Sequence, residues 1–350
     1  MSAASTEPLA PDGEARLTRT RAAACEVLAS GASFVLATHE NPDGDALGSM
    51  IAMRGLLRAL GKQVVLFISR SDLPLPHEYR FLRLEDVIET PPQDIAHRTV
   101  VFLDCGNIDR NPAAMLREAA VLLNIDHHHD NTRFGSVNHV VPTASCTAEI
   151  IWDLMNALEV RPTPRVAEAL YVALVTDTGR FMYETTGPTA HYMAADLIQA
   201  GVDVQGLYRK LFEEVPLAKL KLLGLALNSV ASYDEGQLTL ASLSADDFVA
   251  VEAEEAHCEG IVDHLRSVRG TKVAALIREG PASQGTARRK VSLRATDDDV
   301  DVSAIARTQG GGGHRRAAGF PTELEREEIV TLLRRELARQ LPDRAPAPVA

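Results

Sequence analysis

Three short apolar runs in the first half of the chain each lead directly into a residue that can bind a metal ion. The runs are 33–38, 99–103 and 120–125, and the residues that follow them are His39, Asp104 and Asp126. Such runs are typical of buried strands, and helical or loop material separates them. Because the carboxyl ends of parallel strands meet at one edge of a sheet, these polar residues are expected to lie close together. The pattern predicts an α/β fold whose parallel sheet has helices on both faces.

The rest of the chain shows further strand and helix patterns. The stretch 63–69 repeats the strand pattern, and 46–60 has apolar residues at helical spacing before Gly61, which is typical of a helix end. Further helices are predicted over 147–158, 165–175 and 189–224, further strands over 237–243, 273–278 and 290–295, and a terminal helix over 323–340.

A change of pattern after residue 228 predicts two domains in this chain of 350 residues. We expect a first domain over 16–205, a helical linker over 206–232 and a smaller α/β domain over 233–340. Residues 1–15 are small, polar and acidic, and 341–350 are rich in Pro and Ala, so a disordered leader and a disordered tail are expected at the two ends.

Four motifs carry the metal-binding residue types. They are His39-x-x-x-Asp43-x-Asp45, Asp104, Asp126-His127-His128 and Asp177. Each has a plainer interpretation, because Asp favours helix N-termini, a lone Asp often ends a strand, and histidines also occur in solvated turns. Three histidines directly after an apolar strand are nevertheless unusual, and His129 is expected to be a surface residue. Together the motifs supply imidazole and carboxylate ligands for two divalent ions, as in sites that hydrolyse phosphate esters.

Mixed His and carboxylate ligation favours Mn²⁺ over Mg²⁺, which prefers oxygen ligands alone. We therefore expect two divalent ions, with Mn²⁺ first and with Mg²⁺ or Co²⁺ as alternatives.

A glycine-rich segment near the C-terminus predicts an anion-binding surface. Gly310 to Gly313 are followed by His314 and Arg315, and the chain then returns to small apolar residues. The alternative is a flexible linker. Glycine backbone lets amides approach an anion closely, and His and Arg add charged donors. We expect Gly312, Gly313, His314 and Arg315 to bind the substrate, together with Arg294 at the end of a predicted strand.

The charge distribution limits the partners. The net charge of −12 argues against binding of long nucleic acid, which depends on neutralising phosphates. Residues 261–320 nevertheless carry +5, so the rest carries −17, and this local basic segment suits a small anionic ligand. No apolar run reaches the roughly 20 residues of a membrane helix, and the four cysteines are scattered. We therefore expect a cytoplasmic protein with no membrane association.

These motifs, in this order, resemble those of the DHH phosphoesterase superfamily. The resemblance covers residues 20–335, and the segment 310–319 resembles the glycine-rich signature of the DHHA1 domain. Chain length and domain spacing resemble the bacterial bifunctional oligoribonuclease/pAp phosphatase subgroup, which includes enzymes that degrade cyclic dinucleotides.

The resemblance implies a DHH metal-binding catalytic domain and a DHHA1 substrate-binding domain, with the active site in the cleft between them. It implies that His39, Asp43 and Asp104 hold one metal, and that Asp45, Asp104, His127 and Asp177 hold the other. His128 would contact the scissile phosphate and Asp126 would orient the histidines. A homodimer is also implied.

The implied activity is metal-dependent hydrolysis of short RNA fragments (nanoRNA) by exonuclease action, of linear dinucleotides such as pApA and pGpG, and of pAp to AMP and phosphate. Two alternatives stay open. One is a pyrophosphatase or polyphosphatase of the same superfamily, and the other is a non-catalytic nucleotide sensor built on the same fold.

Overall fold

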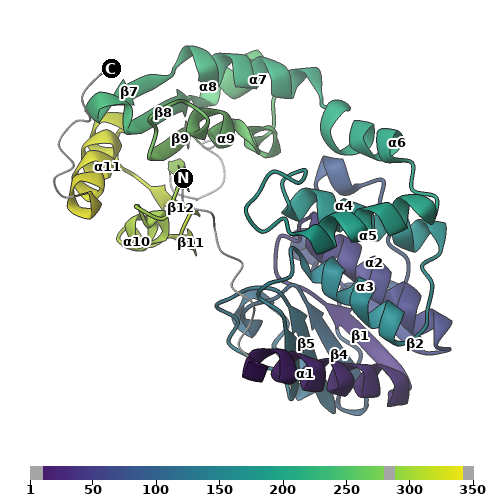
Figure 1. Ribbon diagram of the computed structural model, residues 1–350. Coiled ribbons are helices and arrows are strands. Elements are labelled where there is room, and N and C mark those ends of the chain that lie inside the picture. Colours follow the sequence, from purple (N-terminus) through teal and green to yellow (C-terminus); the bar gives the residue numbers. More distant parts are fainter. Residues whose placement is uncertain (1–10, 280–287, 342–350) are drawn as a thin grey trace. The chain divides into compact units, whose positions relative to one another are not determined.

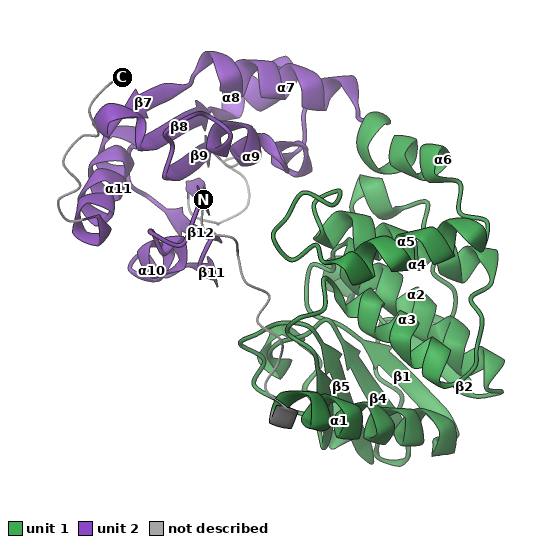
Figure 2. Cartoon of the chain, in the orientation of Figure 1, with its two compact units in different colours: residues 1–214 green, residues 215–350 purple. Residues whose placement is uncertain are grey.

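The computed structural model describes residues 11–279 and 288–341, which form two compact units. Unit 1 comprises residues 1–214 and unit 2 residues 215–350 (Figure 2). The boundary falls inside the stretch 206–232, where a linker is predicted. Helix α1 (Pro11–Ser30) begins inside the range of the predicted leader, whose first ten residues lie outside the described residues, as does the predicted tail from residue 342 onward. No helix in the described ranges has the length and apolar character needed to cross a membrane.

Unit 1 contains a six-stranded sheet in which every neighbouring pair of strands is parallel (Figure 1). Its strands are β1 (Ser33–Ala37), β2 (Gln63–Phe67), β3 (Val87–Ile88), β4 (Thr99–Leu103), β5 (Val121–Asp126) and β6 (Val137–Val140). They lie in the order β3-β2-β1-β4-β5-β6. The strands that precede His39, Asp104 and Asp126 are therefore three direct neighbours, β1, β4 and β5, as their apolar runs predict.

The α-helices of unit 1 gather on one face of this sheet. They are α1, α2 (Gly44–Ala59), α3 (Thr147–Ala157), α4 (Pro164–Asp177), α5 (Pro188–Gln199) and α6 (Val204–Tyr208), followed by a π-helical turn over Arg209–Glu213. Helices α1 to α5 share one core with Phe34, Leu36 and Leu103 of the strands. The opposite face, with Val35 and Phe102, is covered by short 3₁₀ turns that bury Ile95 and Leu116. Helices therefore cover both faces as predicted, with α-helices on one face and short 3₁₀ helices on the other.

Glycine residues let α2 and α4 approach each other closely. A Cβ atom at Gly48 would lie 2.4 Å from the backbone oxygen of Ala169 and 2.8 Å from the Cβ of Ala173. A Cβ at Gly44 would lie 2.3 Å from the hydroxyl of Thr176. Only residues without a side chain permit this contact. The contact brings the first turn of α2 beside the last turn of α4.

Unit 2 contains a mixed sheet with helices on both faces. Its strands are β7 (Ala231–Tyr233), β8 (Leu238–Leu243), β9 (Val273–Glu279), β10 (Arg289–Ala295), β11 (Gly312–His314) and β12 (Ala317–Thr322). They lie in the order β11-β12-β10-β9-β8-β7, and only β8 and β9 pair in parallel. Its helices are α7 (Leu217–Asn228), α8 (Ala245–Ala250), α9 (Ile261–Arg266), α10 (Val302–Arg307) and α11 (Arg326–Gln340). One core lies against α10 and α11, and the other against α7 and α9.

Candidate metal centre

The four motifs of unit 1 come together at the carboxyl edge of the parallel sheet. His39 lies two residues beyond β1, Asp104 follows β4 directly, and Asp126 is the last residue of β5. Asp43 and Asp45 stand at the start of α2, and Asp177 is the last residue of α4. The close contact between α2 and α4 thus brings the last carboxylate to the others.

Asp104 lies at the centre of the cluster. Its Oδ2 is 3.5 Å from Nε2 of His39, and its Oδ1 is 3.6 Å from Nε2 of His127. The residue is 2% exposed and has a φ of +56°, a left-handed conformation that non-glycine residues rarely adopt. Strained backbone of this kind persists where the surrounding structure holds it, often at functional sites. The two oxygens face imidazoles from different motifs, as a carboxylate shared between two ions requires.

Three groups of side chains have ligand atoms within 4.8 Å of one another, which is the spacing that a metal ion could bridge. They are His39, Asp43 and Asp104; Asp45, His127 and Asp177; and Asp104, His127 and His128. The first group coincides with one predicted ligand set. The second contains three of the four members of the other set, and its fourth member, Asp104, contacts His127. His129, expected at the surface, is exposed and belongs to none of these groups.

Backbone donors hold the carboxylate of Asp45. Its Oδ2 accepts a hydrogen bond from the amide of Thr147 at 2.7 Å, and its Oδ1 accepts one from Ala148 at 3.1 Å. Both amides belong to the first turn of α3, where unpaired N–H groups favour an anion. Asp43 is also a helix cap, because its Oδ1 accepts a hydrogen bond from the amide of Ala46 at the start of α2. A helix cap and a metal ligand are therefore compatible in the same side chain.

Crowded negative charge makes the cluster suited to cations. Burial and the neighbouring carboxylates of Asp104 and Asp43 raise the pKa of Asp177 to about 7, although His127 opposes this rise. Burial and the charges of Asp104 and Asp177 raise the pKa of Asp45 well above its ordinary value. Burial acts in the same sense on Asp104, but the histidines around it lower its pKa. Divalent cations would relieve this mutual repulsion, and the donor set of imidazole and carboxylate fits ions of the Mn²⁺ type.

A buried network orients His128. Its Nδ1 lies 2.8 Å from Oδ1 of Asp126, which is fully buried, and Asn131 donates to the other oxygen at 2.5 Å. Because a carboxylate can only accept, Nδ1 carries the proton in this contact. Burial opposes the charged ring, but Asp126 and Asp104 raise the pKa of His128 to about 9. Asn131 escaped the sequence reasoning, although it lies within the polar turn after β5.

Arg110 is a second residue that sequence reasoning missed. Its backbone oxygen accepts a hydrogen bond from the amide of Glu40 at 2.7 Å, which ties the loop after β4 to the loop that carries His39. Its positive charge opposes the rise in the pKa of both His39 and His128. Within the described ranges, no carboxylate forms an ion pair with its guanidinium. The signal in the sequence is a basic residue six positions beyond a strand-end Asp, which is too weak to use alone.

In unit 2, the glycine-rich segment forms a hairpin, so it is not a flexible linker. Gly312, Gly313 and His314 of β11 pair with Gly319, Ala318 and Ala317 of β12. Arg294 of β10 also pairs with Ala317, so Arg294 and His314 stand in one row across the sheet. A Cβ at Gly312 would meet nothing within 4 Å, so its surface is open. The side chain of His314 lies outside the described residues.

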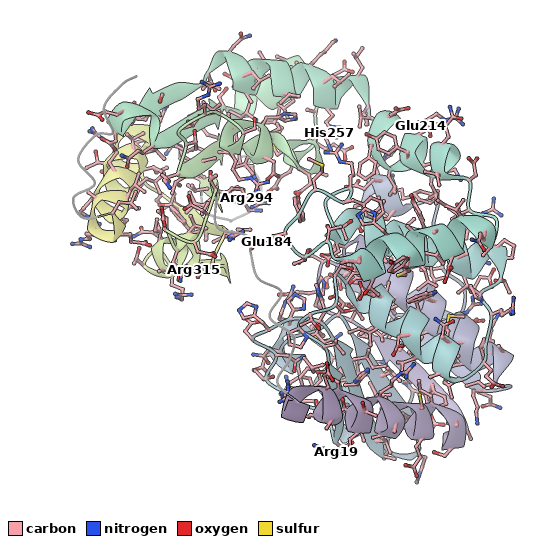
Figure 3. The ribbon with its side chains drawn as sticks, in the orientation of Figure 1. Arg19, Glu184, Glu214, His257, Arg294 and Arg315 are labelled. Carbon is pink, nitrogen blue, oxygen red and sulfur yellow. The ribbon has the colours of Figure 1, made fainter. Side chains whose placement is uncertain are left out.

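Arg315 occupies a different position from this row. It lies in the turn between β11 and β12 (Figure 3). Its guanidinium donates to the backbone oxygen of Asp298 at 2.8 Å. Arg278 of β9, which sequence reasoning missed, lies near this row. Its guanidinium donates a hydrogen bond to the hydroxyl of Ser292 at 3.0 Å. Ser292 lies two residues from Arg294 on the same strand and therefore on the same face.

The fold and the site define a class, an α/β phosphoesterase whose candidate metal centre combines His and Asp side chains. Comparison with known proteins agrees. The model of the DHH family, N-terminal domain, matches residues 33–174, and the DHHA1 domain matches residues 246–339. The bifunctional oligoribonuclease and PAP phosphatase NrnA of Thermus thermophilus is 32% identical over 87% of this chain and 90% of that protein. Its Bacillus subtilis counterpart is 25% identical over 82% and 88%.

Solved structures show the same fold. An exopolyphosphatase-related protein from Bacteroides fragilis superposes with a TM-score of 0.80 at 21% identity, covering 92% of this chain and 96% of that chain. RecJ of Thermus thermophilus in complex with Mn²⁺ reaches 0.52 at 16% identity, covering 95% of this chain and 55% of that one. This chain belongs to the DHH/DHHA1 phosphoesterase superfamily, in the subgroup of the NrnA-type bifunctional oligoribonucleases and PAP phosphatases.

Proposed function

We propose that this chain hydrolyses short oligoribonucleotides and linear dinucleotides to mononucleotides, and pAp to AMP and phosphate. The observation that carries the proposal is the position of Asp104, whose two oxygens face His39 and His127 inside a buried, acid-rich cluster. The names of the relatives supply the substrate class, since they describe an oligoribonuclease and PAP phosphatase. The free cysteines of the chain fit action in the cytoplasm.

Two divalent ions are proposed as cofactors, with Mn²⁺ preferred. His39, Asp43 and Asp104 would hold one ion, and Asp45, Asp104, His127 and Asp177 the other. The grouping of their ligand atoms supports this assignment. Bound ions of this kind activate water as a nucleophile near neutral pH and stabilise charge on phosphoryl oxygens.

His128 is proposed to bind the scissile phosphate. Asp126 holds its Nδ1 and so fixes the orientation of the ring, and the raised pKa favours the protonated ring at neutral pH. A protonated imidazole donates a charge-assisted hydrogen bond to an anion. Asp126 makes no contact with the substrate in this scheme and positions His128.

Unit 2 is proposed to bind the remainder of the substrate through Arg294, Gly312, Gly313, His314 and Arg315. The open surface at Gly312 supports close approach of a ligand to the backbone. Arg315 would have to exchange or share its contact with Asp298 when it binds a phosphate. The local charge of +5 in an acidic chain fits a short anionic substrate better than a long one.

A substrate panel tests the proposal. Turnover of pAp, pApA and pyrophosphate would be measured with Mn²⁺, Mg²⁺ and Co²⁺, and we expect AMP from the first two and little phosphate from pyrophosphate. Rapid pyrophosphate cleavage with inert pApA would instead establish a pyrophosphatase. Tight binding of pApA without release of AMP would establish a nucleotide sensor.

A homodimer is proposed as the oligomeric state, and one face of α7 is the candidate contact. Leu217, Leu220 and Leu227 are 66%, 52% and 48% exposed, and at Gly224 a Cβ would meet nothing within 4 Å. These positions share one helical face, and a glycine in the middle permits a second helix to approach. Light scattering should give a dimer for the wild type and a monomer for Leu220→Glu. A monomeric wild type would contradict the proposal.

A further inference from the structure

The loop from Thr178 to Gly187, between α4 and α5, has an unusual backbone. Gly179, Arg180 and Phe181 follow one another with φ values of +54°, +63° and +64°. Non-glycine residues rarely adopt this region, and two in succession persist only where their surroundings hold them. The loop begins directly after Asp177, so its conformation is held at the edge of the metal centre.

Several contacts fix this conformation. The hydroxyl of Thr178 accepts a hydrogen bond from the amide of Phe181 at 3.1 Å, and its backbone oxygen accepts from Met182 and Tyr183 at 3.0 Å. The Phe181 ring stacks on His191, with centroids 5.0 Å apart. Arg180 lies over the ring of Phe212. Arg180 and Phe181 thus each contact a neighbouring ring, whereas the next two residues, Met182 and Tyr183, are exposed.

Those two side chains are large and apolar, and solvent reaches both. Met182 is 81% exposed and Tyr183 is 49% exposed. The Tyr183 ring lies across the backbone of Gly179, where a Cβ would be 2.4 to 2.7 Å from three ring atoms. One side of the ring therefore rests on a residue two positions beyond Asp177, within about 7 Å along the chain.

We propose that Tyr183, with Met182 beside it, is a stacking surface for a nucleobase of the substrate. Every base has an aromatic face, so a tyrosine can stack on different bases without reading their edges. Tyrosine also supplies a large contact area with few rotatable bonds, and methionine adapts to irregular surfaces. Pyrophosphate has no base and gains nothing from this contact. The surface would therefore select nucleotides over simple phosphate anhydrides.

The inference rests on the proposed function, and its test compares substrates with and without a base. KM and kcat would be measured for pAp and for the corresponding ribose bisphosphate, using the wild type, Tyr183→Ala, Tyr183→Leu and Tyr183→Phe. We expect Tyr183→Ala and Tyr183→Leu to raise KM for pAp about 10-fold, with kcat unchanged and with no effect on the base-free analogue. Tyr183→Phe should keep the wild-type KM.

Controls separate stacking from a structural role. Tyr192→Ala, at a tyrosine that is 69% exposed on α5, should leave both substrates unaffected. Calorimetric titration with Mn²⁺ should give the same affinity for Tyr183→Leu as for the wild type, since the leucine still covers Gly179. An unchanged KM for pAp, or an equal rise for both substrates, would overturn the inference.

Binding measurements keep this test distinct from the test of the activity. The affinities of AMP and ribose phosphate are compared by calorimetry, without turnover. Tyr183→Leu should lose about 10-fold in affinity for AMP and nothing for ribose phosphate. If the wild type hydrolysed no nucleotide, the proposed function would fail. A base-dependent loss of AMP binding would then still support the stacking surface, and equal binding by both proteins would refute it.

Discussion

Replacing Gly48 by alanine tests whether close packing of α2 against α4 assembles the metal centre. The new Cβ would lie 2.4 Å from the backbone oxygen of Ala169, whereas ordinary contacts begin at 3.4 Å. The two helices must therefore separate by about 1 Å, because neither neighbour is a flexible side chain. That displacement acts between Asp45, at the start of α2, and Asp177, at the end of α4.

The expected magnitudes follow from this displacement. Overpacking costs about 1 to 3 kcal/mol, and the higher helix propensity of alanine offsets about 1 kcal/mol of it. The free energy of unfolding should then fall by up to about 2 kcal/mol. Metal sites tolerate errors of only about 0.2 Å in ligand distance, so a shift of about 1 Å should weaken Mn²⁺ binding at least about 10-fold.

Urea unfolding without metal and calorimetric titration with Mn²⁺ measure the two effects. The control is Gly224→Ala on α7, where the Cβ meets nothing within 4 Å. It should bind Mn²⁺ as the wild type does, because α7 carries no metal ligand; only its Mn²⁺ affinity serves as the control, since Gly224 lies on the proposed dimer face. If Gly48→Ala gained stability and kept its Mn²⁺ affinity, close contact between α2 and α4 would not be what brings the ligands together.

Three further predictions concern the cluster, the glycine hairpin and a buried histidine. Asp104→Asn should abolish turnover and Mn²⁺ binding while urea unfolding stays cooperative; retained turnover would show that the ligand assignment is wrong. Gly312→Ala should leave stability unchanged, because its Cβ enters open space, but should raise KM for pAp; an unchanged KM would count against contact with substrate there. Burial and the charge of Arg21 lower the pKa of His139 to about 4 from 6.5, so the folded chain binds fewer protons than the unfolded chain between these values. Stability is therefore lost as the pH falls through this window, by about 2 kcal/mol at about pH 5, and His139→Gln should remove this part of the loss. Urea unfolding at about pH 7 and about pH 5 measures it, and an identical loss in the variant would refute the assignment.

Periodicity located most of the elements around the site. The apolar run 99–103 coincides with β4, and the runs before His39 and Asp126 match β1 and β5 to within one residue at either end. These strands are buried on both faces, so their apolar character is continuous and easily recognised. Helix α1 and the edge strands β3 and β6 were not foreseen. Edge strands are short and partly exposed, so their sequences carry a weaker signal.

Some features of the candidate site could likewise be located from the sequence, and others could not. His39, Asp104 and Asp126 follow from the sequence, because the chemistry of each residue and its place at a strand end are local properties. The amides of α3 that hold Asp45, the contact of Asn131 with Asp126 and the hydrogen bond from Arg315 to the backbone of Asp298 depend on residues distant in the chain or on the exact path of a turn.

The sequence by itself determined the residue types of the candidate metal centre and the parallel order of strands that gathers them at one edge, because residue type and hydrophobic period are local. Only the tertiary structure decided how the carboxylate of Asp177 comes close to the other candidate ligands. Asp177 reaches the cluster because glycines let α2 and α4 pack against each other, and a contact between distant helices leaves no periodic trace in either one. The position of the Tyr183 ring was also decided by the structure, because the fold places the ring against Gly179.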